Sequence, residues 1–168
     1  RFWESEFEII QPKKNRKGNR QFTKEDIDNV KLIYHLVKEK GFTLTGGYEL
    51  LGADKVVGKS FQTPLATLHK FNGWADLFLT TPAAGLEDRY VSVSKVFPKV
   101  KDFPGLNATV AYHDFRSDVG GTKYGTEWDA SVGFKVKTVG LLLKYADYNA
   151  KKFGANKSIM WLQAEVAF

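Results

Sequence analysis

One segment of the chain has the residue types and spacing of a phosphate-binding loop. Residues 53–60 read Ala-Asp-Lys-Val-Val-Gly-Lys-Ser, which satisfies the relaxed pattern A-x4-G-K-S and follows a predicted strand. Phosphate binding needs several backbone N–H groups curled around the ligand and a helix that starts at the serine. Pro64 follows four residues after that serine, and the loop lacks the leading and internal glycines. We therefore assign no nucleotide binding to this segment.

Few other side chains of the sequence can support catalysis. The chain has no cysteine, and its three histidines, at positions 35, 69 and 113, lack the spacing of paired metal ligands. No serine lies in a nucleophile-elbow setting, and no sequence argument brings two carboxylates together. The sequence therefore predicts no metal, no cofactor and no enzymatic activity.

A basic run near the N-terminus is the strongest charge signal of the chain, whose 168 residues carry a net charge of +6. Residues 13–20 hold five lysines and arginines, no acid and a Gly-Asn turn signal. Such a loop can bind a nucleic-acid backbone, because lysine and arginine release its counterions; a solvated turn is the alternative. The candidate nucleic-acid-binding residues of this run are Lys13, Lys14, Arg16, Lys17 and Arg20.

A helix is predicted directly after the basic run. Thr23 is a candidate N-cap, and acidic residues follow it in the first turn, where backbone N–H groups are unpaired. Apolar residues then recur at helical spacing from Ile27 to Val37, and Gly41 is a natural residue to follow the helix. From about residue 44 the period changes from 3.6 to 2. We expect a helical, winged-helix-like fragment over residues 1–43 and an antiparallel β portion over residues 44–168.

The N-terminal part resembles the winged helix-turn-helix of MerR-family transcription regulators. The resemblance lies in Arg1-Phe2-Trp3-Glu4, in the segment from Pro12 to Arg20, in Phe22-Thr23 and in the helix through Tyr34. It implies DNA contacts by Arg1, Arg16, Lys17 and Arg20. It also implies that the first helix and most of the recognition helix would lie upstream of Arg1. Because the chain begins without Met, we expect a processed product or a fragment.

The β portion alternates apolar and polar residues over long segments. The most regular is Thr126–Lys137, with Trp128, Val132 and Val136 among the apolar positions. The six predicted strands are 44–53, 88–97, 107–116, 126–137, 139–148 and 158–168. At about ten residues they are longer than the ~5–6 typical of soluble strands and match the ~9–11 of membrane-spanning strands.

Loop lengths and aromatic residues also favour a membrane barrel. The connections on one side of the strands are on average shorter than those on the other. The aromatic residues are expected to form two interfacial girdles: Tyr112, Trp128, Tyr145 and Tyr148 at one rim, and Phe97, Phe134 and Phe168 at the other. The predicted fold class is mainly β, with about six antiparallel up-and-down strands of an outer-membrane β-barrel and a short α-helical N-terminal region. Six strands cannot close alone, so two open edges are expected.

The β portion resembles alginate-export-type outer-membrane proteins. The resemblance lies in residues 61–76, in Thr81-Pro82, in residues 85–88 and in the segments 142–148 and 161–165. It implies an outer-membrane, porin-like channel that passively passes a polar solute, in some members an anionic polysaccharide. The implied partners are outer-membrane lipid, that solute and, through a terminal Phe168, the barrel-assembly machinery. The face assignment predicts lumen-lining positions at Asp129, Lys135, Lys144, Gln163 and Glu165.

Three functional interpretations therefore stay open. The leading one is a porin-like outer-membrane channel fragment. The alternatives are a truncated MerR-type DNA-binding module and a soluble β-sandwich that buries the same apolar face in a core. Because a cytoplasmic regulator and an outer-membrane pore belong to different compartments, we also expect a chimera or mispredicted fusion, with its joint near residues 42–47.

Overall fold

A computed structural model describes residues 12–15, 17–54, 59–63, 71–98 and 105–166. By its contacts the chain divides into two compact units, Arg1–Leu44 and Thr45–Phe168. No described helix has both the length and the apolar character needed to cross a membrane.

The first unit contains a small wing. Strand β1 (Lys13–Lys14) pairs antiparallel with β2 (Arg20–Gln21). The side chain of Asn15 holds the turn between them, because its Oδ1 accepts the backbone N–H groups of Lys17 and Asn19, each at 2.9 Å. Gly18 adopts a left-handed backbone there, with φ of +79°. The Gly-Asn turn signal is thus part of a real hairpin.

Helix α2 (Lys24–Tyr34) starts where the sequence predicts. The Thr23 Oγ1 atom accepts the backbone N–H of Asp26 at 3.1 Å, and the Asp26 carboxylate accepts the backbone N–H of Thr23 at 2.7 Å. This reciprocal capping box satisfies two N–H groups that the first turn leaves unpaired. A π-helical turn, His35–Glu39, follows α2, and Gly41 ends the segment with φ of +68°.

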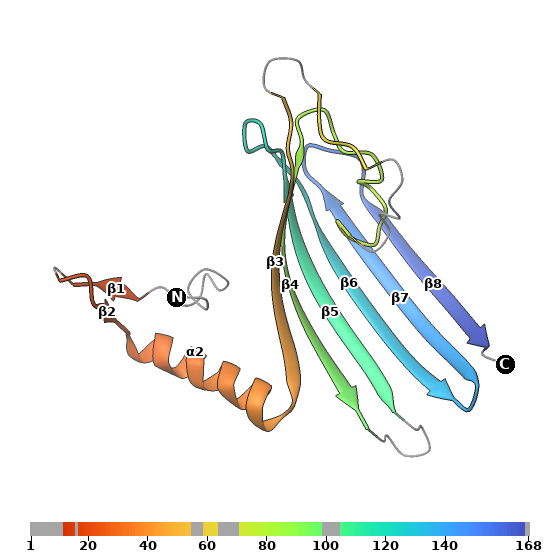
Figure 1. The fold of residues 1–168 in the computed structure, drawn as a ribbon, viewed down its shortest axis with the longest axis horizontal. Coiled ribbons are helices and arrows are strands. Elements are labelled where there is room, and N and C mark those ends of the chain that lie inside the picture. Colours follow the sequence, from red (N-terminus) through yellow and green to blue (C-terminus); the bar gives the residue numbers. More distant parts are fainter. Residues whose placement is uncertain (1–11, 16, 55–58, 64–70, 99–104, 167–168) are drawn as a thin grey trace. The chain divides into compact units, whose positions relative to one another are not determined.

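The second unit is built on one antiparallel sheet whose six strands follow each other in chain order (Figure 1). The strands are β3 (Phe42–Leu51), β4 (Leu86–Phe97), β5 (Leu106–Arg116), β6 (Lys123–Val136), β7 (Val139–Ala150) and β8 (Lys157–Val166). All six predicted strands are found. In the described residues the sheet does not close on itself, and β3 and β8 form its two edges.

The tightest connection of the sheet joins β6 and β7. Val136 pairs with Val139, so that only Lys137 and Thr138 form the turn. Lys137 is one of three non-glycine residues with positive φ in the described chain, at +53°. The two strands then pair without interruption from this turn up to Gly125 and Ala150.

The strand register assigns each side chain to one of two faces, because cross-strand partners share a face. Trp128 pairs with Tyr112, and Val132 pairs with Leu143. All four side chains lie on the same side of the sheet and belong to one continuous apolar surface, called here the outer face. Its large exposed members include Val93, Val110, Trp128, Val132, Val136, Leu143, Tyr145, Met160, Leu162 and Val166.

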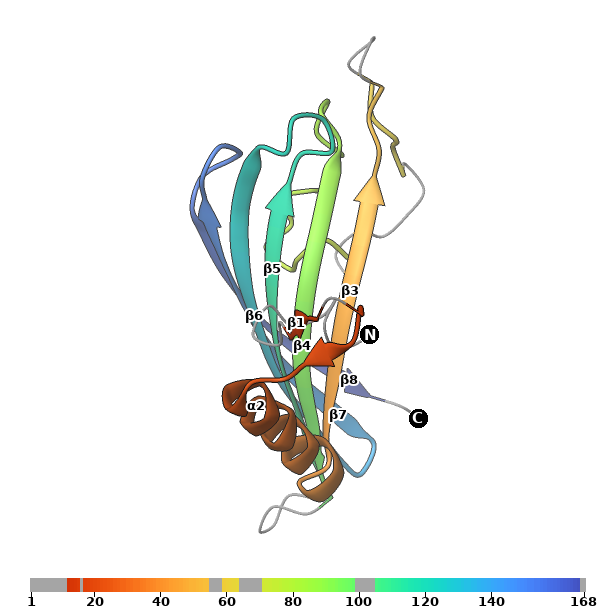
Figure 2. The same ribbon diagram turned by 90° about the vertical axis from the view of Figure 1, so that its left-hand side faces the viewer.

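The opposite, inner face is covered near one end by the segment that precedes β4 (Figure 2, yellow-green). Phe78 of this segment is 1% exposed and lies against Phe115, with the ring centroids 4.6 Å apart. Its ring also contacts those of Tyr124, Tyr148 and Phe153, at 6.0, 6.0 and 5.2 Å. The core of this unit is therefore an aromatic cluster between the segment and the sheet.

The structure corrects the predicted position of Tyr148. This residue does not join an aromatic girdle with Tyr145 on the outer face; it is 1% exposed on the inner face. Its hydroxyl donates to the backbone oxygens of Tyr124 and Phe153, at 3.1 and 3.0 Å. Tyr148 lies three positions after Tyr145, and an odd offset along a strand places two side chains on opposite faces.

Candidate functional site

The wing gathers part of the predicted nucleic-acid-binding set. Lys13 and Lys14 lie on β1, Lys17 lies in the turn, and Arg20 lies on β2. Lys13 and Lys17 are exposed. Arg1 and Arg16 lie outside the described residues. The hairpin thus brings lysines from its first strand and its turn into one small exposed element, as a contact to nucleic-acid phosphates requires.

The strand register places all five predicted lumen-lining residues on the inner face. Lys144 pairs with Ser131 and Trp161, and the other members follow at even spacing along the same strands. Lys135, Gln163 and Glu165 are exposed. Lys135 and Glu165 line a small cavity of about 110 Å³ together with Thr138 and Gly140.

Asp129 differs from the other four because the covering segment buries it. Its carboxylate is 1% exposed and accepts the backbone N–H of Trp74 at 3.3 Å. Lys144 lies nearby with its ammonium group 4.3 Å from the centre of the Trp74 ring and 5.3 Å from that of Trp161. The structure therefore makes Asp129 a docking residue for the segment, where the sequence predicts an open lumen position.

A buried acidic cluster forms the floor beneath the segment. Glu127 is 0% exposed, and its Oε1 accepts the backbone N–H of Ala75 at 2.6 Å. His113 bridges Asp88 and Asp129, with its Nδ1 2.9 Å from Asp88 and its Nε2 3.6 Å from Asp129. Glu127 and Asp129 hold the segment by accepting its backbone N–H groups, and His113 links Asp129 to Asp88. In the described residues no three such side chains come together as a metal site.

Sequence reasoning missed Glu127 as a functional position. It lies two residues before Asp129 on the polar side of the most regular strand, and this Glu-x-Asp spacing was the available signal. Burial, together with the negative charge of Asp129, raises the pKa of Glu127 to about 8. The raised pKa favours the protonated form of the Glu127 carboxyl group, and a hydrogen bond to Asp129 favours the same form.

The raised pKa of Glu127 predicts a pH-dependent stability of the second unit. The folded state keeps the proton up to about pH 8, whereas the unfolded chain releases it near 4.5. The stabilisation from the Glu127 carboxyl group is therefore complete below pH 4.5 and is lost as the pH rises through about 8. We expect the free energy of unfolding to fall by up to about 1.4 kcal/mol per pH unit over this range. Urea unfolding at a series of pH values measures it.

Glu127→Gln provides the critical comparison for this pH dependence. The amide can accept the Ala75 N–H and donate to Asp129 without a titratable proton. It should flatten the slope, whereas Glu165→Gln, at an exposed position of the same face, should leave the slope unchanged. Equal slopes in the wild-type protein and Glu127→Gln would contradict the assignment of the proton to Glu127.

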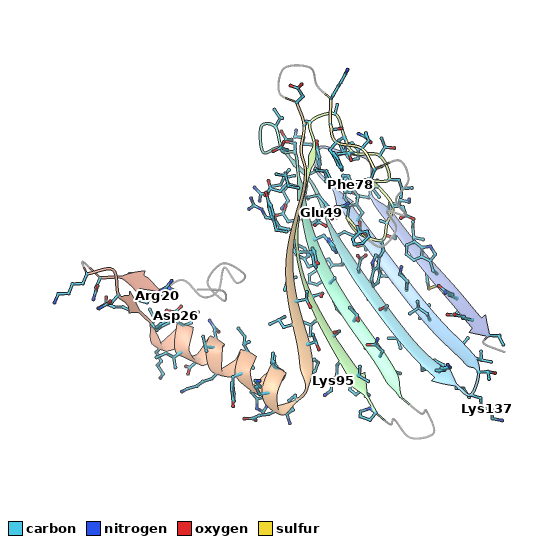
Figure 3. All side chains as sticks on the ribbon, viewed as in Figure 1. Arg20, Asp26, Glu49, Phe78, Lys95 and Lys137 are labelled. Carbon is cyan, nitrogen blue, oxygen red and sulfur yellow. The ribbon has the colours of Figure 1, made fainter. Side chains whose placement is uncertain are left out.

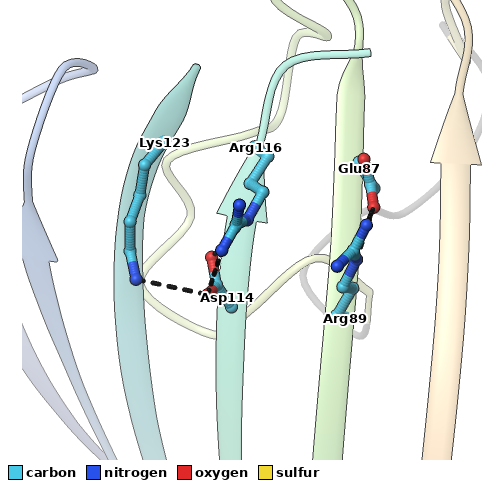
Figure 4. Close-up of polar contacts among 5 residues, drawn as sticks. All are labelled: Glu87, Arg89, Asp114, Arg116 and Lys123. Carbon is cyan, nitrogen blue, oxygen red and sulfur yellow. Dashed lines mark hydrogen bonds and ion pairs between the residues drawn. The ribbon is translucent and has the colours of Figure 1, made fainter. Parts of the chain in front are cut away.

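In the described residues, apart from Lys95 and from the exposed Asp147, which pairs with Trp128, the charged side chains of the outer face lie toward one end. Arg89 pairs with Glu87 there, and Asp114 accepts from Arg116 at 3.3 Å and from Lys123 at 3.2 Å (Figure 4). These five residues are called the charged belt. Directly below them the rings of Tyr112 and Trp128 lie 4.9 Å apart. The order from belt to aromatic pair to apolar surface follows the polarity gradient of a membrane interface.

Lys95 interrupts the apolar surface on β4. Its ammonium group lies 4.9 Å from the centre of the Phe97 ring, toward the end of the strand (Figure 3). A lysine can cover an apolar surface with its methylene groups while its charge reaches the interface. The position is therefore compatible with a surface that is otherwise apolar.

Comparison with protein-family models finds a match to the N-terminal part of the chain. Residues 1–53 match the model described as MerR HTH family regulatory protein, which covers the first 53 of 168 residues. The match supports the predicted MerR resemblance and implies DNA binding by a regulator, not catalysis, for this part of the chain. No curated protein and no solved structure matches the chain. The resemblance of residues 44–168 to alginate-export proteins stays a prediction.

Proposed function

We propose that the first unit is a DNA-binding module of a transcription regulator. The observation that carries this proposal is the match of residues 1–53 to MerR HTH regulatory proteins. The wing supports it, because its hairpin presents the exposed Lys13 on β1 and the exposed Lys17 in the turn. The capped helix α2 follows the wing directly in the sequence.

A salt titration of DNA binding tests the proposal. The full chain is titrated with a random-sequence DNA duplex at several salt concentrations, as wild type and as the double variant Lys13→Ala/Lys17→Ala. Each phosphate contact contributes about −0.9 to the slope of log K against log salt concentration. We expect the double variant to reduce the slope by about 2 and to weaken binding by more than tenfold at low salt.

The matched control removes the same charge from the second unit. Lys151→Ala/Lys152→Ala changes two exposed lysines and should bind DNA like the wild-type protein. Binding without salt dependence, or an equal loss in both double variants, would show that the wing does not contact phosphates. This readout does not depend on a recognition helix, because phosphate contacts carry affinity and not sequence preference.

We infer a second function for the other unit, as a lipid-facing wall of a porin-like channel in an outer membrane. The specific observation that favours it is the exposed outer face. Trp128, Leu143 and Val166 are 54%, 44% and 55% exposed on it. A soluble β-sandwich would bury these side chains in a shared core. The charged belt and the aromatic pair below it further support contact with acyl chains below a polar interface.

The inner face gives this channel its lining and its constriction. Polar residues such as Lys135, Gln163 and Glu165 would face water, while the segment around Phe78 narrows the passage from inside. Strands beyond the six would complete the barrel. A polar solute is the proposed cargo, and Phe168, the proposed contact to the barrel-assembly machinery, lies outside the described residues. The functions of the two units are proposed independently.

A further inference from the structure

In the described part of the second unit, a large cavity lies beside the acidic cluster. Its volume is about 480 Å³, within the range of small-molecule sites. The walls come from β3, β4, β5 and the start of the covering segment, and Figure 3 shows one of its side chains, Glu49, at the same end of the sheet as Phe78. Its lining residues include Glu49, Asn72, Trp74, Asp88, Tyr90 and Thr109.

Asn72 is the unexplained residue of this cavity. It lines the space, is 4% exposed, and neither its Nδ2 nor its Oδ1 has a hydrogen-bond partner in the described part of the chain. A buried amide without partners is unfavourable by about 1–3 kcal/mol per group. The backbone also holds it in an unusual conformation, because Asn72 and Gly73 both have positive φ, at 57° and 80°. A buried asparagine without hydrogen-bond partners at the wall of a cavity indicates a ligand that supplies those partners.

The chemistry of Asn72 selects the kind of ligand. An amide needs an acceptor for its N–H groups and a donor for its oxygen, and a hydroxyl group offers both. An ammonium group could only donate, and a carboxylate could only accept. Ligands with several hydroxyl groups therefore fit the amide best. Because both amide atoms are screened from solvent, such a ligand would shift residues 71–74 slightly as it enters.

The charge of the walls argues against an acidic ligand. Glu49 and Asp88 both line the cavity, and the basic side chain among the lining residues, His113, is held by Asp88 at 2.9 Å. An anion placed here would face these carboxylates across a space of low dielectric constant. Neutral hydroxyl groups instead donate hydrogen bonds to carboxylates. The ligand is thus neutral, in contrast to the anionic solute that the sequence resemblance implies.

Aromatic side chains give the cavity an apolar surface. Trp74 and Tyr90 both line it. The Tyr90 ring is fixed, because it stacks on His113 at 5.1 Å and because a Cβ on Gly47 would come within 2.1 Å of it. A site that combines aromatic rings with a few fixed polar groups suits a ligand with apolar C–H faces and polar edges. A sugar ring has both.

We propose that this cavity is a binding subsite for a neutral sugar, recognised through Asn72. Within the channel proposed for this unit it would act as a solute subsite on the inner face. Sugar binding requires the cavity but not insertion into a membrane. An experiment can therefore contradict the sugar proposal without contradicting the membrane proposal, and the reverse.

Calorimetric titration of the full chain with maltose, cellobiose and glucuronate tests the proposal. Measurable binding of at least one neutral disaccharide is expected, with glucuronate at least tenfold weaker. Asn72→Asp keeps the size of the side chain and tolerates positive φ, but it removes the donor and adds a charge. It should weaken neutral-sugar binding at least tenfold. Asn107→Asp, at an exposed position of the same face on β5, should leave binding unchanged.

A second variant keeps the test decisive if Asn72→Asp fails to fold. Thr109→Val removes one hydroxyl group from the wall on β5 with little change of shape and should weaken binding at least threefold. Absence of neutral-sugar binding to the wild-type protein would overturn the proposal. Tighter binding of glucuronate than of either disaccharide, or unchanged binding in both cavity variants, would also overturn it.

Discussion

Val132→Arg should severely destabilise the second unit in a membrane-like environment. Val132 lies in the middle of the outer-face positions of β6, which run from Trp128 to Val136. These nine residues span about 26 Å at ~3.3 Å per residue, or about 20 Å when the strand is tilted as in a barrel. An arginine there would place its charge near the centre of the acyl layer. We expect a loss of about 2–4 kcal/mol in the free energy of unfolding.

Ser131→Arg is the matched control for this variant. It introduces the same side chain one residue away, on the inner face, where Ser131 pairs with Lys144. Its effect should stay below about 1 kcal/mol, since the inner face is polar. Urea unfolding of protein folded in detergent micelles, followed by tryptophan fluorescence, compares the two. Equal tolerance of both substitutions, or a monodisperse protein without detergent, would contradict the lipid-facing assignment.

Phe78→Ala should release the covering segment from the sheet. The Phe78 side chain is among the largest fully buried ones of the described residues, and four other aromatic rings surround it. Truncation of such a side chain removes about 3–5 kcal/mol of stability, because a cavity remains. Near-UV circular dichroism should lose the aromatic signal of the cluster, and urea unfolding measures the stability.

The neighbouring Leu79→Ala provides the comparison for Phe78→Ala. Leu79 belongs to the same segment but is 54% exposed, so its truncation should change stability by less than about 0.5 kcal/mol. A similar small effect of Phe78→Ala would show that the segment does not depend on the aromatic cluster.

Periodicity explains why the elements of this chain were predictable. The alternation around Val132 predicts both the strand and the face of each side chain, and the register places Asp129, Lys135, Lys144, Gln163 and Glu165 on one face. The capping box at Thr23 fixed the start of α2 for a similar reason, since it lies within four consecutive residues. Local patterns suffice where local geometry decides the structure.

The covering segment shows where such patterns end. The two-residue period of a strand predicts which face of the sheet a side chain lies on. It does not predict which other segment of the chain covers that face. Asp129 was therefore predicted to line an open passage, although Trp74, 55 positions earlier in the chain, covers it. Asn72 and Glu127 acquire their roles only through the same long-range packing. The period of the strands does not predict that the loop before β4, whose apolar residues include Trp74 and Phe78, will fold back over the inner face.

The two-residue turn at Lys137 and Thr138 bears on the order in which the sheet assembles. It closes the shortest loop between the two strands with the longest uninterrupted pairing, so the chain entropy lost in joining them is small. Hairpins of this kind form in about 1–10 μs, well before distant segments meet. We expect β6 and β7 to form the first hairpin of the sheet. The neighbouring strands β5 and β8 would then pair with this hairpin, followed by β4 and β3. Phe78 can dock only after three strands and a loop have brought the other four aromatic rings together. We therefore expect its docking to be the late and rate-limiting event of folding.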